Sequence, residues 1–257
     1  MTKLRGVIFD LGGTLLDYHP PGGDWRSMEE LGASGWYAHL QARGHPLPDE
    51  ATVKQTVWEE VSGAWRRFGE GKPTNLAEMA LIRLLGRAAH RLGLALTPED
   101  ARDAERAFIE AVQTIVRPLP GAAELLAGLR ARGLRLGLIS NTMWPGAYHE
   151  ADLARFGLRE PFEVLFFSSD ERVWKPDPEI FRRAARALGL TPEEAAFIGD
   201  SRTMDVMGAQ RAGLRGVWIE NSDPYLSEGL HITPDATIRR LLDLLPLVDA
   251  WRDDRLT

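Results

Sequence analysis

Short apolar runs that end in polar residues recur along the chain. The first covers residues 5–10 and ends at Asp10, just before Gly12 and Gly13. Four more follow in the second half of the sequence, over residues 134–141, 164–169, 195–200 and 215–220. Continuous apolar runs of this length, bounded by turn residues, are typical of buried strands. The pattern therefore predicts five buried strands whose last residues are polar.

Segments with helical periodicity separate the later strands. They cover residues 122–132, 178–188 and 204–212, and each stops before a glycine, the residue that most readily ends a helix. Buried strands that alternate with helices are typical of a parallel sheet covered on both faces. The sequence therefore predicts an α/β fold with a Rossmann-like parallel sheet core and helices on both faces. Such sheets bind ligands at the carboxyl ends of their strands.

The region between the first strand and the others contains no strand of this type. Helical periodicity instead covers residues 27–43, 49–68, 76–92 and 98–116. Stretches rich in proline and glycine bracket the region, at residues 20–23 and 118–121, and are typical of stiff or hinge-like connections. We predict a mainly helical cap domain over residues 17–117, inserted into a core domain that comprises residues 1–16 and 118–257.

Composition narrows the chemistry. The chain has 257 residues, 44% hydrophobic and 26% charged, which is typical of a globular protein large enough to bury a sizeable core. It contains no cysteine, and this excludes disulfides, thiolate metal sites and a cysteine nucleophile.

Charge and hydropathy indicate a small partner. The formal net charge of −6 gives no general attraction to nucleic acid or anionic lipid, so we expect neither as a partner. No stretch approaches the roughly 18 consecutive apolar residues of a membrane helix. The first apolar run contains Asp10 and has no small-residue cleavage site, unlike a signal peptide. We therefore expect a cytoplasmic protein, and the sequence indicates no particular oligomeric state.

Polar residues that could carry chemistry cluster in four blocks at or after predicted strand ends. The blocks are FDLGGTL over residues 9–15, ISNT over 139–142, KPDP over 175–178 and GDSRTMD over 199–205. Each block alone recurs by chance. In this order they resemble the four motifs of the haloacid dehalogenase-like (HAD) hydrolases. The resemblance covers residues 1–16 and about 118–220, and the helical insertion resembles the family's mainly helical cap.

The resemblance implies phosphoryl chemistry on a carboxylate. Asp10 would be the nucleophile that forms an aspartyl phosphate, which water then hydrolyses. A phosphoryl dianion repels a carboxylate, so the site needs a cation, and oxygen ligands suit Mg²⁺. The family pattern implies Mg²⁺ binding by Asp10, the Gly12 carbonyl and Asp200, with Asp205 nearby in an outer or water-mediated role.

The resemblance also implies the groups that hold the small phosphorylated substrate. Donors would stabilise the phosphoryl oxygens in the transition state. Thr14 and Lys175 would assist Asp10 in catalysis, and Lys175 would also bridge the carboxylates. The phosphate-binding residues would be Gly13, Ser140, Asn141 (side chain or backbone amide) and Lys175.

A structural interpretation of the same residues stays open. Asp10 and Asp200 would then cap helices or turns, Ser140 and Asn141 would be turn residues, and Lys175 a solvated surface residue. Acidic residues are also favoured in a first helical turn, which applies to Asp205.

One departure from the family pattern affects the expected rate. Phosphatases of this family commonly carry a second Asp two residues after the nucleophile, where this chain has Gly12. That Asp is a general acid and base, and such catalysis is worth about 10²- to 10⁴-fold. The absence predicts slow turnover, a substrate with a good leaving group, or a donor borrowed from elsewhere. Asp17, Tyr18 and His19 are the nearest candidates.

Aromatic residues give a weaker signal. Trp58 and Trp65 are seven residues apart, which is helical spacing, so we expect core packing for them and for Trp25 and Trp36. Trp144 and His149 follow the second motif on a predicted loop, where they would contact substrate or lie at the surface.

Several functions remain in competition. The leading hypothesis is a Mg²⁺-dependent phosphohydrolase acting on a small metabolite. A dehalogenase would need no metal, but acidic groups beside Asp10 would raise its pKa unless a cation were present. A regulatory protein that binds phosphate and metal without turnover is a third possibility, suggested by Gly12. A phosphomutase would need the acid-base group that Gly12 replaces.

Overall fold

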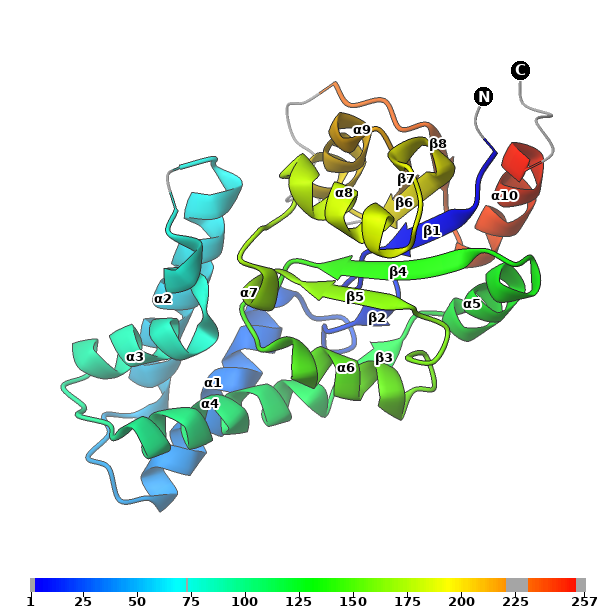
Figure 1. The fold of residues 1–257 in the computed structure, drawn as a ribbon. Coiled ribbons are helices and arrows are strands. Elements are labelled where there is room, and N and C mark those ends of the chain that lie inside the picture. The colour runs from blue at the N-terminus through cyan, green and yellow to red at the C-terminus, as the bar shows by residue number, and fades with distance from the viewer. Residues whose placement is uncertain (1–2, 73, 221–230, 253–257) are drawn as a thin grey trace. The chain divides into compact units, whose positions relative to one another are not determined.

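The computed structural model describes residues 3–72, 74–220 and 231–252 (Figure 1). The chain divides into two compact units. The first, here called the core unit, comprises Met1–Asp17, Arg117–Thr142 and His149–Thr257. The second, here called the helical unit, comprises Tyr18–Val116 and Met143–Tyr148. No helix in the described residues is long and apolar enough to cross a membrane.

A parallel sheet of six strands forms the centre of the core unit, in the order β5-β4-β1-β6-β7-β8. Five strands coincide with predicted runs: β1 (Gly6–Phe9), β4 (Arg135–Ser140), β5 (Val164–Phe167), β6 (Ala195–Gly199) and β7 (Arg215–Ile219). The sixth, β8 (Ala236–Ile238), pairs at the edge and was not predicted. It has three residues and only Ile238 is buried, so it lacks the apolar run of the others. The predicted α/β fold is confirmed.

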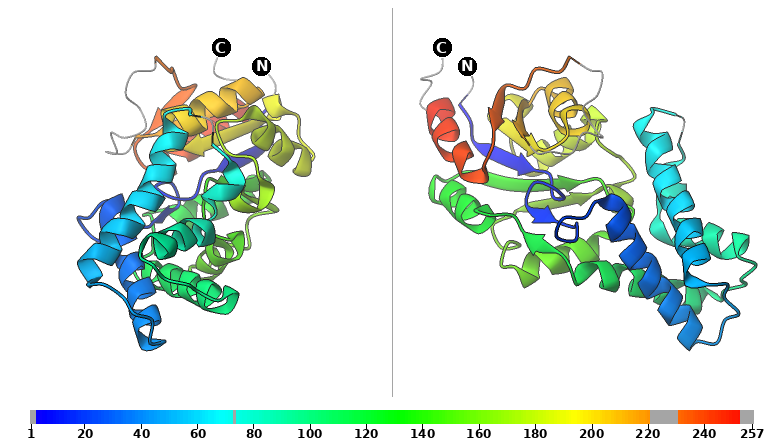
Figure 2. Two further views of the ribbon diagram at one scale, coloured as in Figure 1. Left: turned by 90° about the vertical axis from the view of Figure 1, so that its left-hand side faces the viewer. Right: turned by 180° about the vertical axis from the view of Figure 1, so that it is seen from behind.

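Helices cover both faces of this sheet. They are α5 (Ala122–Ala131), α6 (Gly146–Arg155), α7 (Ser168–Glu171), α8 (Pro178–Ala187), α9 (Gly208–Ala212) and α10 (Leu244–Arg252), with short 3₁₀ turns at Pro192–Glu194 and Leu241–Asp243. Figure 2 shows α8 and α9 on one face and α5 on the other. Phe181 of α8 packs into a fully buried cluster with Ile8, Ile139 and Phe197 of the sheet. This apolar layer fixes the central strands, whose carboxyl ends carry the predicted site residues.

A short antiparallel ribbon also belongs to the core unit. Its strands are β2 (Leu16–Asp17) and β3 (Arg117–Pro118). An Arg117 side-chain nitrogen lies 2.5 Å from an Asp17 carboxylate oxygen. The sequence analysis predicted only a hinge-like connection around residues 118–121, since a two-residue strand leaves no periodic pattern.

The helical unit contains the four predicted helical segments. Its helices are α1 (Trp25–Ala42), α2 (Glu50–Gly69), α3 (Leu81–Arg91) and α4 (Pro98–Gln113), and a 3₁₀ turn covers Leu76–Met79. Asp24, Asp49 and Thr97 cap three of the helices with their side chains. A Cβ at Gly32 of α1 would lie 2.5 Å from the Phe108 ring of α4, so glycine allows these helices to approach closely.

The segment Met143–Tyr148 also packs within the helical unit, although the sequence analysis placed it in the core domain. The backbone N–H of Leu81 donates to the Met143 carbonyl at 2.9 Å. The Trp144 ring meets the Tyr18 ring edge to face, with 5.9 Å between centroids. Trp144 is therefore buried rather than at the surface.

The other tryptophans divide between core and surface. Trp36 is buried as predicted, with 1% of its surface exposed, whereas Trp25 is 40% exposed, so core packing was wrong for that residue. Trp58 and Trp65 are half-buried.

Candidate active site

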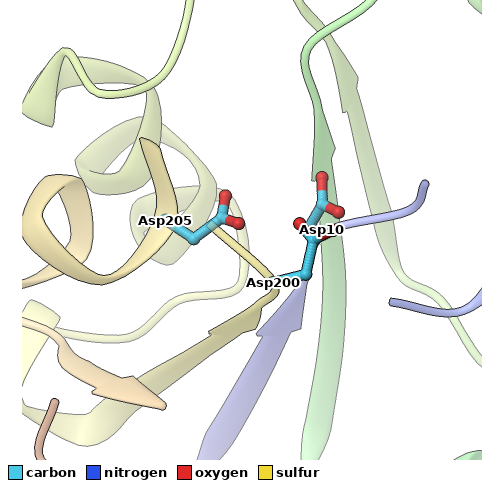
Figure 3. A group of neighbouring side chains, drawn as sticks. All are labelled: Asp10, Asp200 and Asp205. Atoms are coloured by element: carbon cyan, nitrogen blue, oxygen red, sulfur yellow. The ribbon is translucent and has the colours of Figure 1, made fainter. Parts of the chain in front are cut away.

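Three aspartates meet at the carboxyl edge of the sheet. Asp10 directly follows β1 and Asp200 directly follows β6, its neighbour in the sheet. The backbone N–H of Asp10 donates to the Ile198 carbonyl of β6 at 2.9 Å, which continues the pairing to the strand end. Carboxylate oxygens of Asp10, Asp200 and Asp205 all lie within 4.8 Å of one another (Figure 3). The sheet thus brings together acidic residues that lie almost 200 positions apart in sequence.

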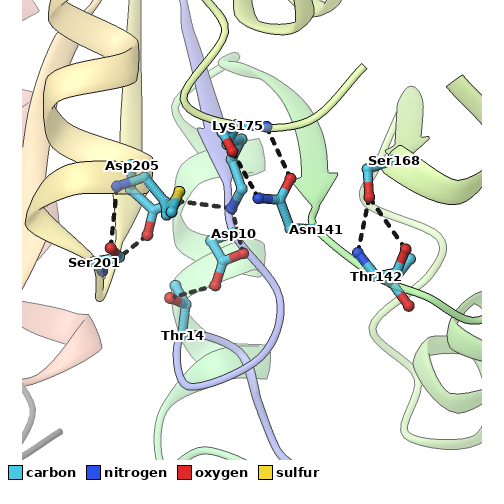
Figure 4. A network of polar contacts seen from close by, with 9 residues as sticks. Asp10, Thr14, Asn141, Thr142, Ser168, Lys175, Ser201 and Asp205 are labelled. Carbon is cyan, nitrogen blue, oxygen red and sulfur yellow. Dashed lines mark hydrogen bonds and ion pairs between the residues drawn. The ribbon is translucent and has the colours of Figure 1, made fainter. Parts of the chain in front are cut away.

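Lys175 links two of these carboxylates. Its Nζ lies 2.6 Å from Asp10 Oδ1 and 2.7 Å from Asp205 Oδ1, and the residue is 2% exposed (Figure 4). Burial on its own would lower the pKa of Lys175, but the charges of Asp10 and Asp205 raise it above its usual value. Lys175 is therefore a buried ammonium group, not a solvated surface residue.

Asp205 is held in place on both of its carboxylate oxygens. While Oδ1 accepts from Lys175, Oδ2 accepts from the backbone N–H of Ser201 at 2.9 Å. Burial raises the pKa of Asp205 to about 6, although Lys175 opposes the shift. A Cβ at Gly199 would lie 2.2 Å from Asp205 Oδ2, so a glycine is needed where this side chain folds back against β6.

A π-helical turn over Arg202–Met207 carries Asp205. The N–H groups of Asp205 and Val206 both donate to the Ser201 carbonyl, at 3.0 and 3.2 Å. The sequence analysis predicted one helix over 204–212, but the structure has this wider turn first and α9 after it. π-helical turns inside helices are frequent at functional sites.

The loop after β1 orients the Asp10 carboxylate. Thr14 Oγ1 donates to Asp10 Oδ2 at 3.1 Å. Gly13 has φ of 78°, in the left-handed region, and its N–H donates to the Leu16 carbonyl at 2.8 Å. The sequence analysis predicted Gly13 as a phosphate-binding residue, and in the structure its N–H closes the loop.

The side chain of Asn141 binds the backbone of Lys175. Its Nδ2 donates to the Lys175 carbonyl at 2.9 Å, and its Oδ1 accepts from the Lys175 N–H at 2.8 Å. The side chain thus clamps the backbone of Lys175, which leaves the backbone amide of Asn141 as the group available to a phosphate. The neighbouring Ser140 is buried at the end of β4, and its hydroxyl makes no hydrogen bond within the described part of the chain.

A buried polar cluster beyond Asn141 was missed by the sequence analysis. Thr142 Oγ1 lies 2.7 Å from His149 Nε2, and the Thr142 N–H donates to Ser168 Oγ at 2.9 Å. The His149 ring stacks on Phe167 with 5.6 Å between centroids. Burial lowers the pKa of His149 to about 3, so this histidine is neutral. It anchors the end of the second motif and is not exposed on a loop, and the 26-residue separation of Thr142 and Ser168 left no local signal.

The sequence matches one family of known proteins over most of its length. The model of the haloacid dehalogenase-like hydrolases matches residues 4–213. The chain belongs to this family. The resemblance inferred from the four motifs is therefore confirmed, and the protein is a hydrolase.

Two curated relatives are similar over nearly the whole chain. The phosphoserine phosphatase of Thermus thermophilus is 34% identical, over 89% of this chain and 95% of the relative. The phosphoglycolate phosphatase of Yersinia pseudotuberculosis is 29% identical, over 95% and 93% respectively. Both names denote enzymes that act on small phosphorylated compounds.

Solved structures share the fold over similar lengths. A HAD phosphatase from Thermococcus onnurineus superposes with a TM-score of 0.65 at 24% identity, covering 95% of this chain and 98% of that one. A 2-haloacid dehalogenase from Pseudomonas syringae gives 0.66 at 27% identity, covering 96% and 98%. The fold is thus shared by phosphatases and dehalogenases, and the site residues must distinguish them.

Proposed function

We propose that this hydrolase is a Mg²⁺-dependent phosphatase of small phosphorylated metabolites that forms an aspartyl phosphate on Asp10. The observation that carries the proposal is the buried cluster in which Lys175 joins Asp10 to Asp205, with Asp200 beside them. A dehalogenase is the second candidate because of its shared fold. Three clustered carboxylates disfavour it, because an uncompensated acidic cluster would make Asp10 harder to ionise.

The donor set fits magnesium. Carboxylate and carbonyl oxygens are the ligands that Mg²⁺ prefers, and three carboxylates cluster here, with Lys175 paired to two of them. The family pattern gives Asp205 an outer role, and the hydrogen bonds from Lys175 and from the Ser201 N–H to its two oxygens are consistent with that role. Asp10, Asp200 and the Gly12 carbonyl would hold the ion. When bound, Mg²⁺ would offset the repulsion between the phosphoryl dianion and the carboxylates.

The residues of the chain carry the chemical steps. One Asp10 oxygen attacks phosphorus while the bond from phosphorus to the ester oxygen breaks, and the leaving alkoxide takes a proton. Thr14 and Lys175 hold the attacking carboxylate in one orientation. The Ser140 hydroxyl, the Asn141 backbone amide and the Lys175 ammonium stabilise the phosphoryl oxygens. Water then hydrolyses the acyl phosphate and regenerates Asp10.

The source of the leaving-group proton limits the substrate range. Gly12 replaces the usual acid, and Asp17 is held in an ion pair with Arg117. Tyr18 and His19 belong to the helical unit. We infer that the enzyme turns over most rapidly those phosphate esters whose leaving groups need little protonation.

Hydrolysis of 4-nitrophenyl phosphate tests the proposal, because its leaving group needs little help. The wild-type protein is assayed with Mg²⁺ and with excess chelator, and Asp10→Asn controls for contaminating phosphatase. Turnover that requires Mg²⁺ and is lost in Asp10→Asn supports a phosphatase. Chloride release from 2-chloropropionate without metal would instead identify a dehalogenase. Phosphate binding without turnover would identify a non-catalytic pocket.

A gain-of-function variant tests the role of position 12. Gly12 is not among the glycines with positive φ, so a side chain at this position would not be forced into the left-handed backbone region. Gly12→Asp should accelerate hydrolysis of an alkyl phosphate by up to about 10²- to 10⁴-fold, and of the aryl phosphate far less. An equal change for both substrates would contradict a missing general acid.

A further inference from the structure

Arg202 is a half-buried cation beside the candidate active site. Its guanidinium carbon lies 3.9 Å from the centroid of the Trp218 ring, in a cation–π contact. Within the part of the chain that the structure describes, the side chain makes no ion pair, and its Nε is shielded from solvent without a hydrogen-bond partner. A partly desolvated guanidinium without an anion is costly unless a ligand supplies one.

The position of this pair is tied to the loop that carries Asp200. Arg202 follows Asp200 by two residues, a stretch of chain that spans at most about 7 Å. Trp218 lies on β7, where it pairs with Gly199 of β6. The indole Nε1 of Trp218 donates to the Asp200 carbonyl at 2.8 Å. The ring therefore fixes both the Asp200 loop and the guanidinium above it.

The charges of the site indicate that Arg202 could pair with a negative group of the substrate. Asp10, Asp200 and Asp205 cluster at the site, and Lys175 is already bonded to Asp10 and Asp205. A substrate that carried a second negative group would need another donor. A cation–π contact leaves the N–H donors of a guanidinium unused, and within the described residues the Arg202 guanidinium forms no ion pair that would occupy them.

We propose that Arg202 binds a carboxylate of the substrate, so that the enzyme prefers phosphate esters of small hydroxy acids. The inference rests on the proposed phosphatase function. Two relatives support it, since the phosphoserine and phosphoglycolate of their names both carry a carboxylate. Arg202 acts on specificity and the Trp218 ring positions it.

A matched pair of substrates tests the inference. The two esters are 2-phosphoglycolate and 2-hydroxyethyl phosphate. They differ at one position, where the first has a carboxylate and the second a neutral hydroxymethyl group. In Arg202→Gln, kcat/KM for 2-phosphoglycolate should fall about 10- to 100-fold more than for the neutral ester, mainly through KM. Arg202→Lys keeps the charge but not the planar edge and should recover only part of the loss. Equal losses for the two esters would overturn the proposal.

Two controls separate this role from a structural one. Arg211→Gln removes the same charge from an exposed position on α9, and the ratio of the two kcat/KM values should not change. Trp218→Leu removes the platform and should shift the ratio in the same direction as Arg202→Gln. Circular dichroism and thermal melting show whether each variant is folded, and a Trp218→Leu variant with an unchanged ratio would contradict the positioning role.

A binding measurement keeps the inference independent of turnover. In an Asp10→Asn background, calorimetry gives the Kd of 2-phosphoglycolate and of 2-hydroxyethyl phosphate with and without Arg202→Gln. Weaker binding of the carboxylate ester alone supports Arg202 even if no hydrolysis is found, in which case the proposed function fails by itself. If hydrolysis is confirmed but Arg202→Gln weakens neither ester selectively, only the inference fails.

Discussion

Asp205 in the core unit and Glu29 in the helical unit are both almost fully buried, with 1% and 4% of their surfaces exposed. Asp205 accepts hydrogen bonds from the Lys175 ammonium and from a backbone N–H. Glu29 accepts one from the Ser62 hydroxyl at 2.7 Å, and no ion pair to it is found among the described residues. Burial raises the pKa of Asp205 to about 6 and that of Glu29 to about 7.

The difference shows how a buried carboxylate can be kept ionised. Desolvation favours the neutral form of both acids. The Lys175 ammonium offsets much of this effect at Asp205, whereas the Ser62 hydroxyl offsets little of it at Glu29. The core unit therefore holds charged groups in fixed positions at neutral pH. The helical unit holds at Glu29 a group that is partly protonated there, which makes its stability sensitive to pH.

Removal of the shared cation should have the largest effect. Lys175→Met leaves Asp10 and Asp205 buried without their partner, so we expect loss of all turnover and a decrease of about 3–5 kcal/mol in the free energy of unfolding at pH 7. The decrease should shrink as pH falls from 7 to 5, because burial raises the pKa of Asp205 to about 6 and its carboxyl group then becomes neutral. Urea denaturation at pH 5 and 7 measures both effects. Adding Asp205→Asn to this variant should restore part of the stability but not the activity, and a deficit independent of pH would contradict the account.

Glu29 should make stability decline with rising pH. Its folded-state pKa is raised from 4.5 to about 7, so its stabilising contribution is complete below 4.5 and is lost as pH rises through 7. The change corresponds to about 3 kcal/mol across this range. Glu29→Gln should be more stable than wild type at pH 8 and remove this part of the slope. Glu30→Gln, a partly exposed neighbour, is the control, and identical slopes for wild type and Glu29→Gln would refute the assignment.

Magnesium should stabilise the protein through the carboxylates of the core unit. At a concentration 100 times its Kd, an ion that binds only the folded state adds about 2.7 kcal/mol. Thermal melting with and without Mg²⁺ should show this increase in wild type and its loss in Asp200→Asn. Glu29→Gln should keep the increase, and an equal response of wild type and Asp200→Asn would argue against the proposed ligand.

The smallest effect is expected at Asp17. Its ion pair with Arg117 is partly exposed, with 20% and 42% of the two side chains accessible, and such pairs contribute at most about 1 kcal/mol. Asp17→Asn should lower stability by no more than this and leave hydrolysis of 4-nitrophenyl phosphate and of an alkyl phosphate unchanged. A selective loss with the alkyl ester would identify Asp17 as the missing acid.

Local pattern was sufficient to predict most of the regular elements. Buried strands appear in the sequence as continuous apolar runs, and amphipathic helices as apolar residues at helical spacing. Glycines mark where several of the helices end. The ribbon of β2 and β3 has no such pattern, because its existence depends on Asp17 meeting Arg117 one hundred residues later. The three-residue β8 was missed for a similar reason.

The family resemblance predicted the acidic residues of the site and the Lys175 bridge between carboxylates, but not the other contacts of the site. Motif order placed Asp10, Lys175, Asp200 and Asp205 together, and the structure does bring them together. Residue type could not show that the Asn141 side chain would bind the Lys175 backbone, because an amide suits a phosphate equally well. Nor could it show the contact of His149 with Thr142, which depends on how α6 folds back after β4.

The assignment of Met143–Tyr148 to the helical unit has a consequence for protein engineering. Exchange or deletion of an inserted unit is usually planned as the replacement of one continuous segment, here Tyr18–Val116. In this chain such a graft would leave behind six residues whose packing partners had been removed, among them Met143 and Trp144, which are 3% and 7% exposed. A transplant that keeps these contacts would have to carry both segments, because the helical unit consists of two separate stretches of chain.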